Sequence, residues 1–150
     1  MNLVYVINTL GAGGAEQHLL NLARDMALRD YKVWVIVLER NIIGGANSLE
    51  QAFIETGVNV IYLHSYAMND FGRWFSLIRL IDKLRPDIIH SNLPRSDFSV
   101  SIVKTMFPDI YWISTIHDTY TKDKYSGYWI FTFVKRNWQR ADRLIAVSKH

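Results

Sequence analysis

The chain has 150 residues, of which 49% are hydrophobic, so it can bury one sizeable core and we expect a single domain. Its formal net charge is only +3, which is weak support for a nucleic-acid partner, and we expect none. Cysteine is absent, which excludes disulfides, thiolate metal sites and cysteine nucleophiles.

The amino-terminal residues run directly into an apolar segment, with no basic leader before it. The longest apolar run is far shorter than the roughly 20 residues that a membrane-spanning helix needs. We therefore expect a cytoplasmic protein, and peripheral association with the inner face of a membrane stays open.

Short apolar runs rich in β-branched and aromatic residues alternate along the chain with segments of helical periodicity. Residues 3–9 form the first predicted strand, and the apolar residues between 15 and 26 then recur three and four apart, as on one face of a helix. Further strands are predicted at 32–38, 58–64, 87–91, 111–117 and 143–148. Further helices are predicted at 75–84, near 96–106 and near 127–140.

Apolar strands that alternate with helices are typical of a parallel sheet covered on both faces. The predicted fold is therefore α/β, a Rossmann-like doubly wound parallel sheet. Residues 40–57 interrupt the alternation, and Ser48 is expected to cap a short helix that runs through Glu55 and ends at Gly57. A final strand would ordinarily be followed by a covering helix, so residues 1–150 are expected to be the first part of a longer protein.

Three glycines, Gly11, Gly13 and Gly14, follow the first predicted strand. In an open parallel sheet, ligands bind beyond the carboxyl ends of the strands. Glycine permits positive φ and the close approach of a ligand, and the amino terminus of a helix attracts an anion such as phosphate. The alternative is that these glycines only form a tight turn between strand and helix.

The glycine stretch differs from the nucleotide-binding patterns that it partly matches. The third glycine of a dinucleotide fingerprint is replaced by Glu16, whose carboxylate would crowd a pyrophosphate. Glu39 could still act as the ribose-binding acid, so a dinucleotide-dependent oxidoreductase stays open as an alternative. The Lys and Ser or Thr of a nucleotide-hydrolase loop are missing.

Histidines close two later strands in the prediction. His90 ends the fourth strand, while His117 and Asp118 end the fifth, so all three are expected at the same edge as the glycines. Each histidine could equally be a structural group. A metal site has little support because no third ligand accompanies the two histidines.

Four stretches, "NTLGAGGAEQHLLNLA", "LRPDIIHSNLP", "STIHD" and "ADRLIAVS", resemble the amino-terminal domain of the retaining glycosyltransferases of family 4. That family has the GT-B fold, in which two Rossmann-like domains face each other, and the resemblance spans almost the whole chain. It implies transfer of a sugar from a nucleotide-sugar donor to an acceptor hydroxyl, with retention and without an obligatory metal or other cofactor. The implied acceptor is a glycan or a lipid-linked molecule of cell-envelope polysaccharide or glycolipid synthesis.

The resemblance also implies roles for individual residues. Gly13 and Gly14, together with Glu16, would face the donor diphosphate, and His117 with Asp118 would lie near the transferred sugar and the acceptor. Two further substrate-binding candidates follow the fourth strand: His90 matches a histidine common in the family, and Asn92 stands where many relatives have a second histidine.

Most donor contacts of the family lie in a second domain. The 150-residue chain alone is therefore expected to turn over little or no substrate. A natural chain that ends at His150 would instead fit a non-catalytic binding module.

Residues 121–143 are basic and aromatic, with a net charge of +4. The simpler interpretation is a helix whose aromatic rings pack on the sheet while its charges stay in water. The alternative is a surface that binds anionic lipid through its cations and its boundary aromatic rings.

Overall fold

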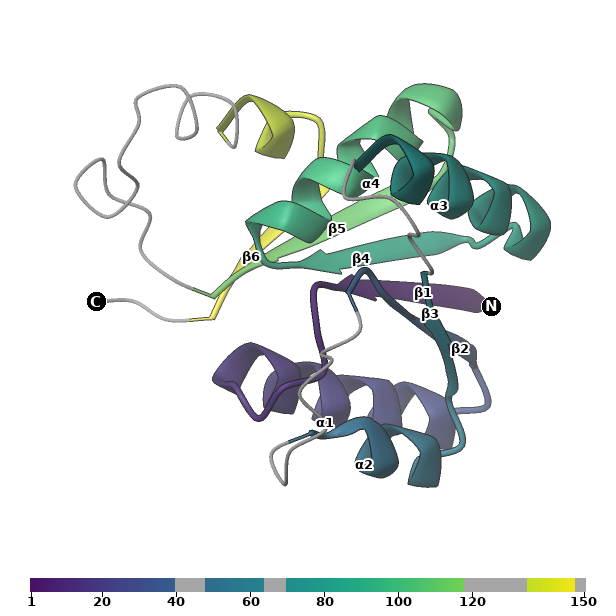
Figure 1. The fold of residues 1–150 in the computed structure, drawn as a ribbon, viewed down its shortest axis with the longest axis vertical. Coiled ribbons are helices and arrows are strands. Elements are labelled where there is room, and N and C mark those ends of the chain that lie inside the picture. Colours follow the sequence, from purple (N-terminus) through teal and green to yellow (C-terminus); the bar gives the residue numbers. More distant parts are fainter. Residues whose placement is uncertain (40–47, 64–69, 118–134, 148–150) are drawn as a thin grey trace.

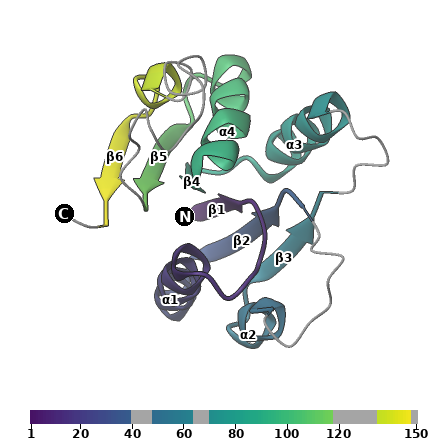
Figure 2. The same ribbon diagram turned by 60° about the vertical axis from the view of Figure 1, so that its left-hand side comes forward.

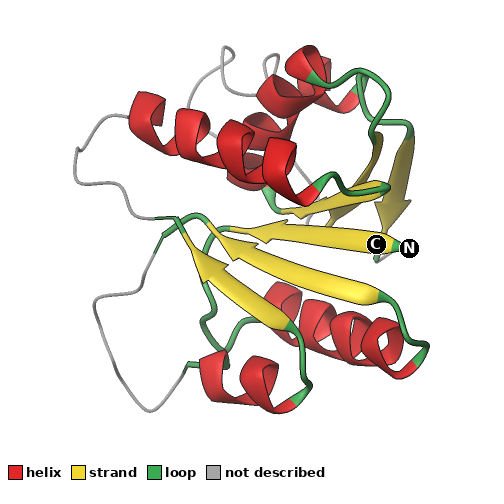
Figure 3. Cartoon of the chain, turned by 90° about the vertical axis from the view of Figure 1, so that its right-hand side faces the viewer, coloured by secondary structure: helices red, strands yellow, loops and turns green. Residues whose placement is uncertain are grey.

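The computed structural model describes residues 1–39, 48–63, 70–117 and 135–147. These residues form a six-stranded parallel sheet in the order β3-β2-β1-β4-β5-β6, with helices on both faces (Figures 1 and 3). The strands are β1 (Asn2–Ile7), β2 (Lys32–Val37), β3 (Asn59–Tyr62), β4 (Ile88–Asn92), β5 (Tyr111–Ile116) and β6 (Arg143–Ala146). The helices are α1 (Gly14–Leu28), α2 (Glu50–Glu55), α3 (Asp70–Leu84) and α4 (Pro94–Met106).

The order of the strands reverses at β1. The chain adds β2 and β3 on one side of β1 and then returns to place β4 on the other side. Because parallel crossovers are right-handed, α1 and α2 cover one face of the sheet and α3 and α4 cover the other (Figure 2). The carboxyl ends of β1 and β4 therefore form the switch point at which such sheets bind ligands.

The core consists of two clusters, one on each face of the sheet. On β1, Leu3, Tyr5 and Ile7 face α1 and α2, whereas Val4 and Val6 face α3 and α4. All five side chains are buried. Burial on both faces explains why this strand is continuously apolar and does not alternate with polar residues.

The predicted elements are present, and most boundary errors concern helix starts. α2 ends at Glu55 and is followed by Gly57, with φ of 79°, as predicted. Its N-cap is Leu49 and not the predicted Ser48, although Ser48 Oγ accepts the Glu50 N–H at 3.2 Å. However, α3 begins at Asp70 and α4 at Pro94, earlier than predicted. Of the helix predicted at 127–140, residues 135–138 are helical and residues 127–134 lie outside the described part of the chain.

A buried carboxylate connects four elements on the α4 face. Asp97 is 1% exposed, and its Oδ1 accepts hydrogen bonds from Ser91 Oγ at 2.6 Å and Ser114 Oγ at 2.8 Å. Its Oδ2 accepts the Nε1–H of Trp138 at 2.8 Å. Burial raises the pKa of Asp97 to about 6, although all three hydrogen bonds act in the opposite direction. The carboxylate thus ties α4 to β4, to β5 and to the helical residues 135–138.

Trp138→Phe should destabilise the fold by about 1–3 kcal/mol, because it leaves a buried carboxylate oxygen of Asp97 without its donor. Urea unfolding at pH 7 measures the change. Trp34→Phe is the matched control, since Trp34 is only partly buried and packs against the core beside the cationic Lys32. Equal losses in the two variants would contradict a specific contribution of the hydrogen bond.

Candidate functional site

The glycine turn after β1 is filled by a side chain of α1. Gly13 is the N-cap of α1, with φ of −80°, so it does not supply the positive φ that glycine was expected to provide. A Cβ on Gly13 would overlap Glu16 Oε2, and Glu16 is buried with Oε1 3.3 Å from the donor Thr9 Oγ1. A side chain at Gly13 would therefore displace the Glu16 carboxylate. That carboxylate lies in the first turn, where the helix dipole favours negative charge.

His117 lies at the end of β5 and contacts residues from two other elements. Its Nε2 is 3.2 Å from Oδ1 of Asn92, the last residue of β4. The ring of His18, on α1, meets the His117 ring edge-on, with 5.3 Å between centroids and 73° between planes. Burial, and then the nearby His18, lower the pKa of His117. Two imidazoles and a primary amide thus meet at the switch point.

His90 lies deeper than the sequence suggested, because β4 continues for two residues beyond it. It is 5% exposed, its Nε2 is 2.6 Å from Thr115 Oγ1, and its ring lies 5.4 Å from that of Tyr5. Burial, with smaller effects from His18 and His117, lowers its pKa to about 4. His90 is therefore a neutral histidine of the sheet interior.

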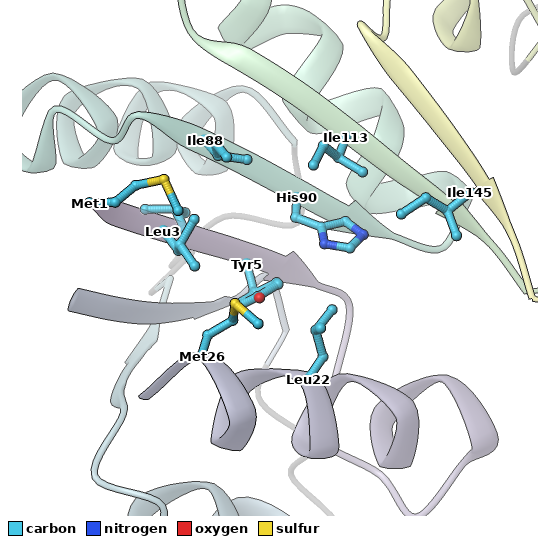
Figure 4. A pocket seen from close by; sticks show the side chains of 10 residues that line it. Met1, Leu3, Tyr5, Leu22, Met26, Ile88, His90, Ile113 and Ile145 are labelled. Atoms are coloured by element: carbon cyan, nitrogen blue, oxygen red, sulfur yellow. The ribbon is translucent and has the colours of Figure 1, made fainter. Parts of the chain in front are cut away.

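An apolar cavity of about 210 Å³ lies on the α1 face, between α1 and strands β1, β4, β5 and β6 (Figure 4). The side chains that line it are apolar, apart from the imidazole of His90 and the phenol of Tyr5 (Figure 4). His90 thus lies between the polar switch point at the strand ends and the apolar cavity beside the same strands.

The turn that carries Asn92 is strained and tightly hydrogen-bonded. Leu93 has φ of 85° and ψ of 148°, a backbone region that is normally left to glycine. The Asn92 N–H donates to Ser96 Oγ at 3.1 Å, and the Ser96 hydroxyl donates to the Asn92 carbonyl. Asn92 is fully buried, and its Nδ2 has no hydrogen-bond partner in the part of the chain that the structure describes. Such strain is typical of functional sites.

Glu39, the candidate ribose-binding acid, is engaged by two cations on the other face of the sheet. Its Oε1 pairs with Arg73 of α3, at 3.5 Å, and with Arg95 of α4. The carboxylate is therefore part of an ion-pair cluster within the protein.

The structure unites some of the candidate residues and separates others. Asn92 and His117 are in contact, Glu16 covers Gly13, and His90 points into the sheet interior. Asp118 lies outside the described residues. His18 was missed as a site residue, although its place on the sheet-facing side of α1, four residues after Gly14, was visible in the sequence. Within the described segments, no group of three acidic or histidine side chains could hold a metal ion.

The fold and this edge define one half of a GT-B protein: a Rossmann-like domain with polar groups gathered at its switch point. The profile of Glycosyltransferase Family 4 matches residues 12–150. The chain therefore belongs to Glycosyltransferase Family 4. No curated protein matches the chain in sequence.

Solved structures resemble the chain in fold. Anabaena Alr3699/HepE, in complex with UDP and glucose, has a TM-score of 0.79 and 15% identity over 99% of this chain and 38% of its own. Acinetobacter baumannii MurG has a TM-score of 0.66 and 10% identity over 100% of this chain and 42% of its own. A UDP-N-acetylglucosamine 2-epimerase has a TM-score of 0.63 and 14% identity over 96% of this chain and 41% of its own. The chain thus spans about two-fifths of the length of these proteins.

Gly13→Ala should destabilise the chain, because its Cβ displaces the buried Glu16 carboxylate from Thr9. Gly14→Ala is the matched control: its Cβ meets nothing within 4 Å, so helix propensity should make it neutral or stabilising by up to about 1 kcal/mol. Thermal unfolding compares them. In a Glu16→Ala background the penalty of Gly13→Ala should vanish, and its persistence there would show that Glu16 is not the cause.

The lowered pKa of His90 predicts a pH-dependent stability. The unfolded chain binds the His90 proton near pH 6.5 and the folded chain only near pH 4, so stability due to neutral His90 is complete above pH 6.5. It falls by up to about 3 kcal/mol as the pH drops to 4. Denaturant unfolding should show wild type losing this stability relative to His90→Gln. A difference that does not change with pH would contradict the prediction.

Proposed function

We propose that the chain is the amino-terminal, acceptor-side domain of a retaining glycosyltransferase that uses a nucleotide-sugar donor and needs no metal. Membership of Glycosyltransferase Family 4 supports transfer, and the UDP and glucose bound to HepE support the donor class. The observation that carries the proposal is the meeting of His117, Asn92 and His18 at the switch point of the sheet. These groups are suited to hydrogen-bonding the hydroxyls of a sugar or an acceptor.

The reaction breaks the bond between the anomeric carbon and the diphosphate oxygen, which keeps the electron pair. A new bond joins the anomeric carbon to the acceptor oxygen, and the proton of the acceptor hydroxyl passes to the departing diphosphate. Backbone N–H groups preorganised toward the leaving diphosphate would stabilise the charge that develops there. Glu16 covers Gly13, so the free approach to α1 lies at Gly14, where nothing stands within 4 Å of the Cβ position.

The alternative of a dinucleotide-dependent oxidoreductase has less support from the structure than from the sequence. The buried Glu16 carboxylate occupies the space at Gly13, and Glu39 is paired with Arg73 and Arg95. Likeness of fold does not choose among activities, because a UDP-N-acetylglucosamine 2-epimerase shares this fold as well.

A glycan or lipid-linked acceptor, and contact with an anionic membrane, remain part of the proposal. Most of residues 121–143 lie outside the described part of the chain. The described helices include none of the length and apolar character that crossing a membrane requires. On α3, Arg73 pairs with Glu39 and Trp74 packs on Phe98, whereas Phe75 is 61% exposed beneath the Arg79 guanidinium.

In a complete enzyme that contains this domain, His117→Ala should reduce kcat by about 100-fold or more, because a group in contact with the reacting hydroxyls is lost. Steady-state transfer assays measure the loss, and thermal unfolding checks the fold. His117→Gln is the matched control, since it retains a hydrogen-bonding amide without a titratable nitrogen.

Near-normal turnover of both variants would remove His117 from the proposed active site. The 150-residue chain alone should show little or no transfer, because it spans only 38% of the length of HepE. Robust transfer by the purified chain would contradict that expectation.

A further inference from the structure

The contact between His117 and Asn92 assigns the proton on the histidine ring. The atom of Asn92 that lies 3.2 Å from His117 Nε2 is Oδ1, a carbonyl oxygen that can only accept a hydrogen bond. Nε2 must therefore donate. In a neutral imidazole the other nitrogen, Nδ1, then carries a lone pair. No hydrogen bond among the described residues uses Nδ1 of His117.

Burial and the bonded backbone of Asn92 fix the place of its side-chain amide beside His117. Its side chain is fully buried, and its backbone N–H and carbonyl are both bonded to the Ser96 hydroxyl. The strained Leu93 and the start of α4 at Pro94 fix the backbone that follows. The opposite orientation of the amide would place the Nδ2 donor at His117 and would require the Nδ1–H tautomer. The two arrangements therefore differ in a measurable way.

His18 acts on the same ring from the side of α1. Its imidazole packs edge-on against His117, and two imidazolium ions at this separation would repel each other. Among the described residues, the other titratable group near His117 is His90 of β4, which burial keeps neutral. The three elements around His117 thus present no carboxylate that would favour its charged form in the described contacts.

We propose that Asn92 and His18 are positioning residues that hold His117 as the neutral Nε2–H tautomer, leaving Nδ1 to accept a hydrogen bond from a ligand hydroxyl. The catalytic meaning of this arrangement rests on the proposed function, whereas the tautomer itself does not. In transfer, a hydroxyl bound at Nδ1 would be oriented with its oxygen lone pairs directed away from the ring.

Nitrogen-15 NMR of the 150-residue chain tests the tautomer directly. Long-range proton–nitrogen correlations at pH 7.5 should show His117 with Nε2 at the shift of an N–H and Nδ1 at that of an unprotonated nitrogen. The His117→Gln spectrum identifies the resonances. A protonated Nδ1 with an unprotonated Nε2 would overturn the proposal.

Three variants separate positioning from a merely structural role. Asn92→Asp keeps an oxygen acceptor and should retain the Nε2–H tautomer, whereas Asn92→Leu should shift both nitrogens toward the averaged values of a histidine in an unstructured peptide. His18→Phe keeps an edge-on ring without the second imidazole, and should raise the titration midpoint of His117. An unchanged His117 spectrum in Asn92→Leu would overturn the role of Asn92, and an unchanged midpoint in His18→Phe would overturn that of His18.

The complete enzyme distinguishes this proposal from the proposed function. Asn92→Leu should lower kcat by about tenfold with the donor KM nearly unchanged, and Asn92→Asp should recover most of the loss. Absence of transferase activity in the wild-type enzyme would refute the proposed function and leave the NMR result standing. Transferase activity together with the Nδ1–H tautomer would refute only the positioning proposal.

Discussion

The buried carboxylate of Asp97 is the interaction on which the carboxyl half of the sheet depends. It accepts hydrogen bonds from Ser91 of β4 and Ser114 of β5, which are register partners. It also accepts one from Trp138, which lies between β5 and β6 in the sequence. On the opposite face the following pair in the register, Asn92 and Thr115, contacts the two histidines. One face of the β4–β5 pair is thus bonded to Asp97, and the opposite face carries the residues that contact His90 and His117. A shift of β4 against β5 would disturb both at once.

The two faces of this strand pair respond to pH in opposite directions. Burial raises the pKa of Asp97 to about 6, so the stability it contributes is lost as the pH rises through that value. Burial lowers the pKa of His90 to about 4, so the stability of its neutral form is lost as the pH falls toward that value. Between about pH 4 and pH 6 the two effects offset each other, and His90 and His117, whose pKa values are lowered, stay uncharged around neutrality. Uncharged imidazoles suit a ligand that is recognised through hydroxyl groups.

Much of the fold could be predicted from the sequence, and less of the site. The strands were visible because burial on both faces makes them continuously apolar, as Val4, Tyr5 and Val6 illustrate. The starts of α3 and α4 were missed, and at α4 the N-cap residue, Leu93, has no side chain that could cap the helix. The depth of His90 and the edge-on pairing of His18 with His117 depend on register and helix rotation, which a single sequence does not specify.

The packing of Glu16 over Gly13 makes these two positions interdependent in evolution. While the carboxylate lies there, any side chain at Gly13 displaces it, and once the carboxylate is gone the constraint on Gly13 disappears. A lineage in which position 13 came to vary freely would therefore first have to replace Glu16. The order of substitutions at positions 13 and 16 is restricted by the overlap between a Cβ at Gly13 and Glu16 Oε2. Descendants that keep the acid should also keep the glycine, so the two residues form one inherited unit.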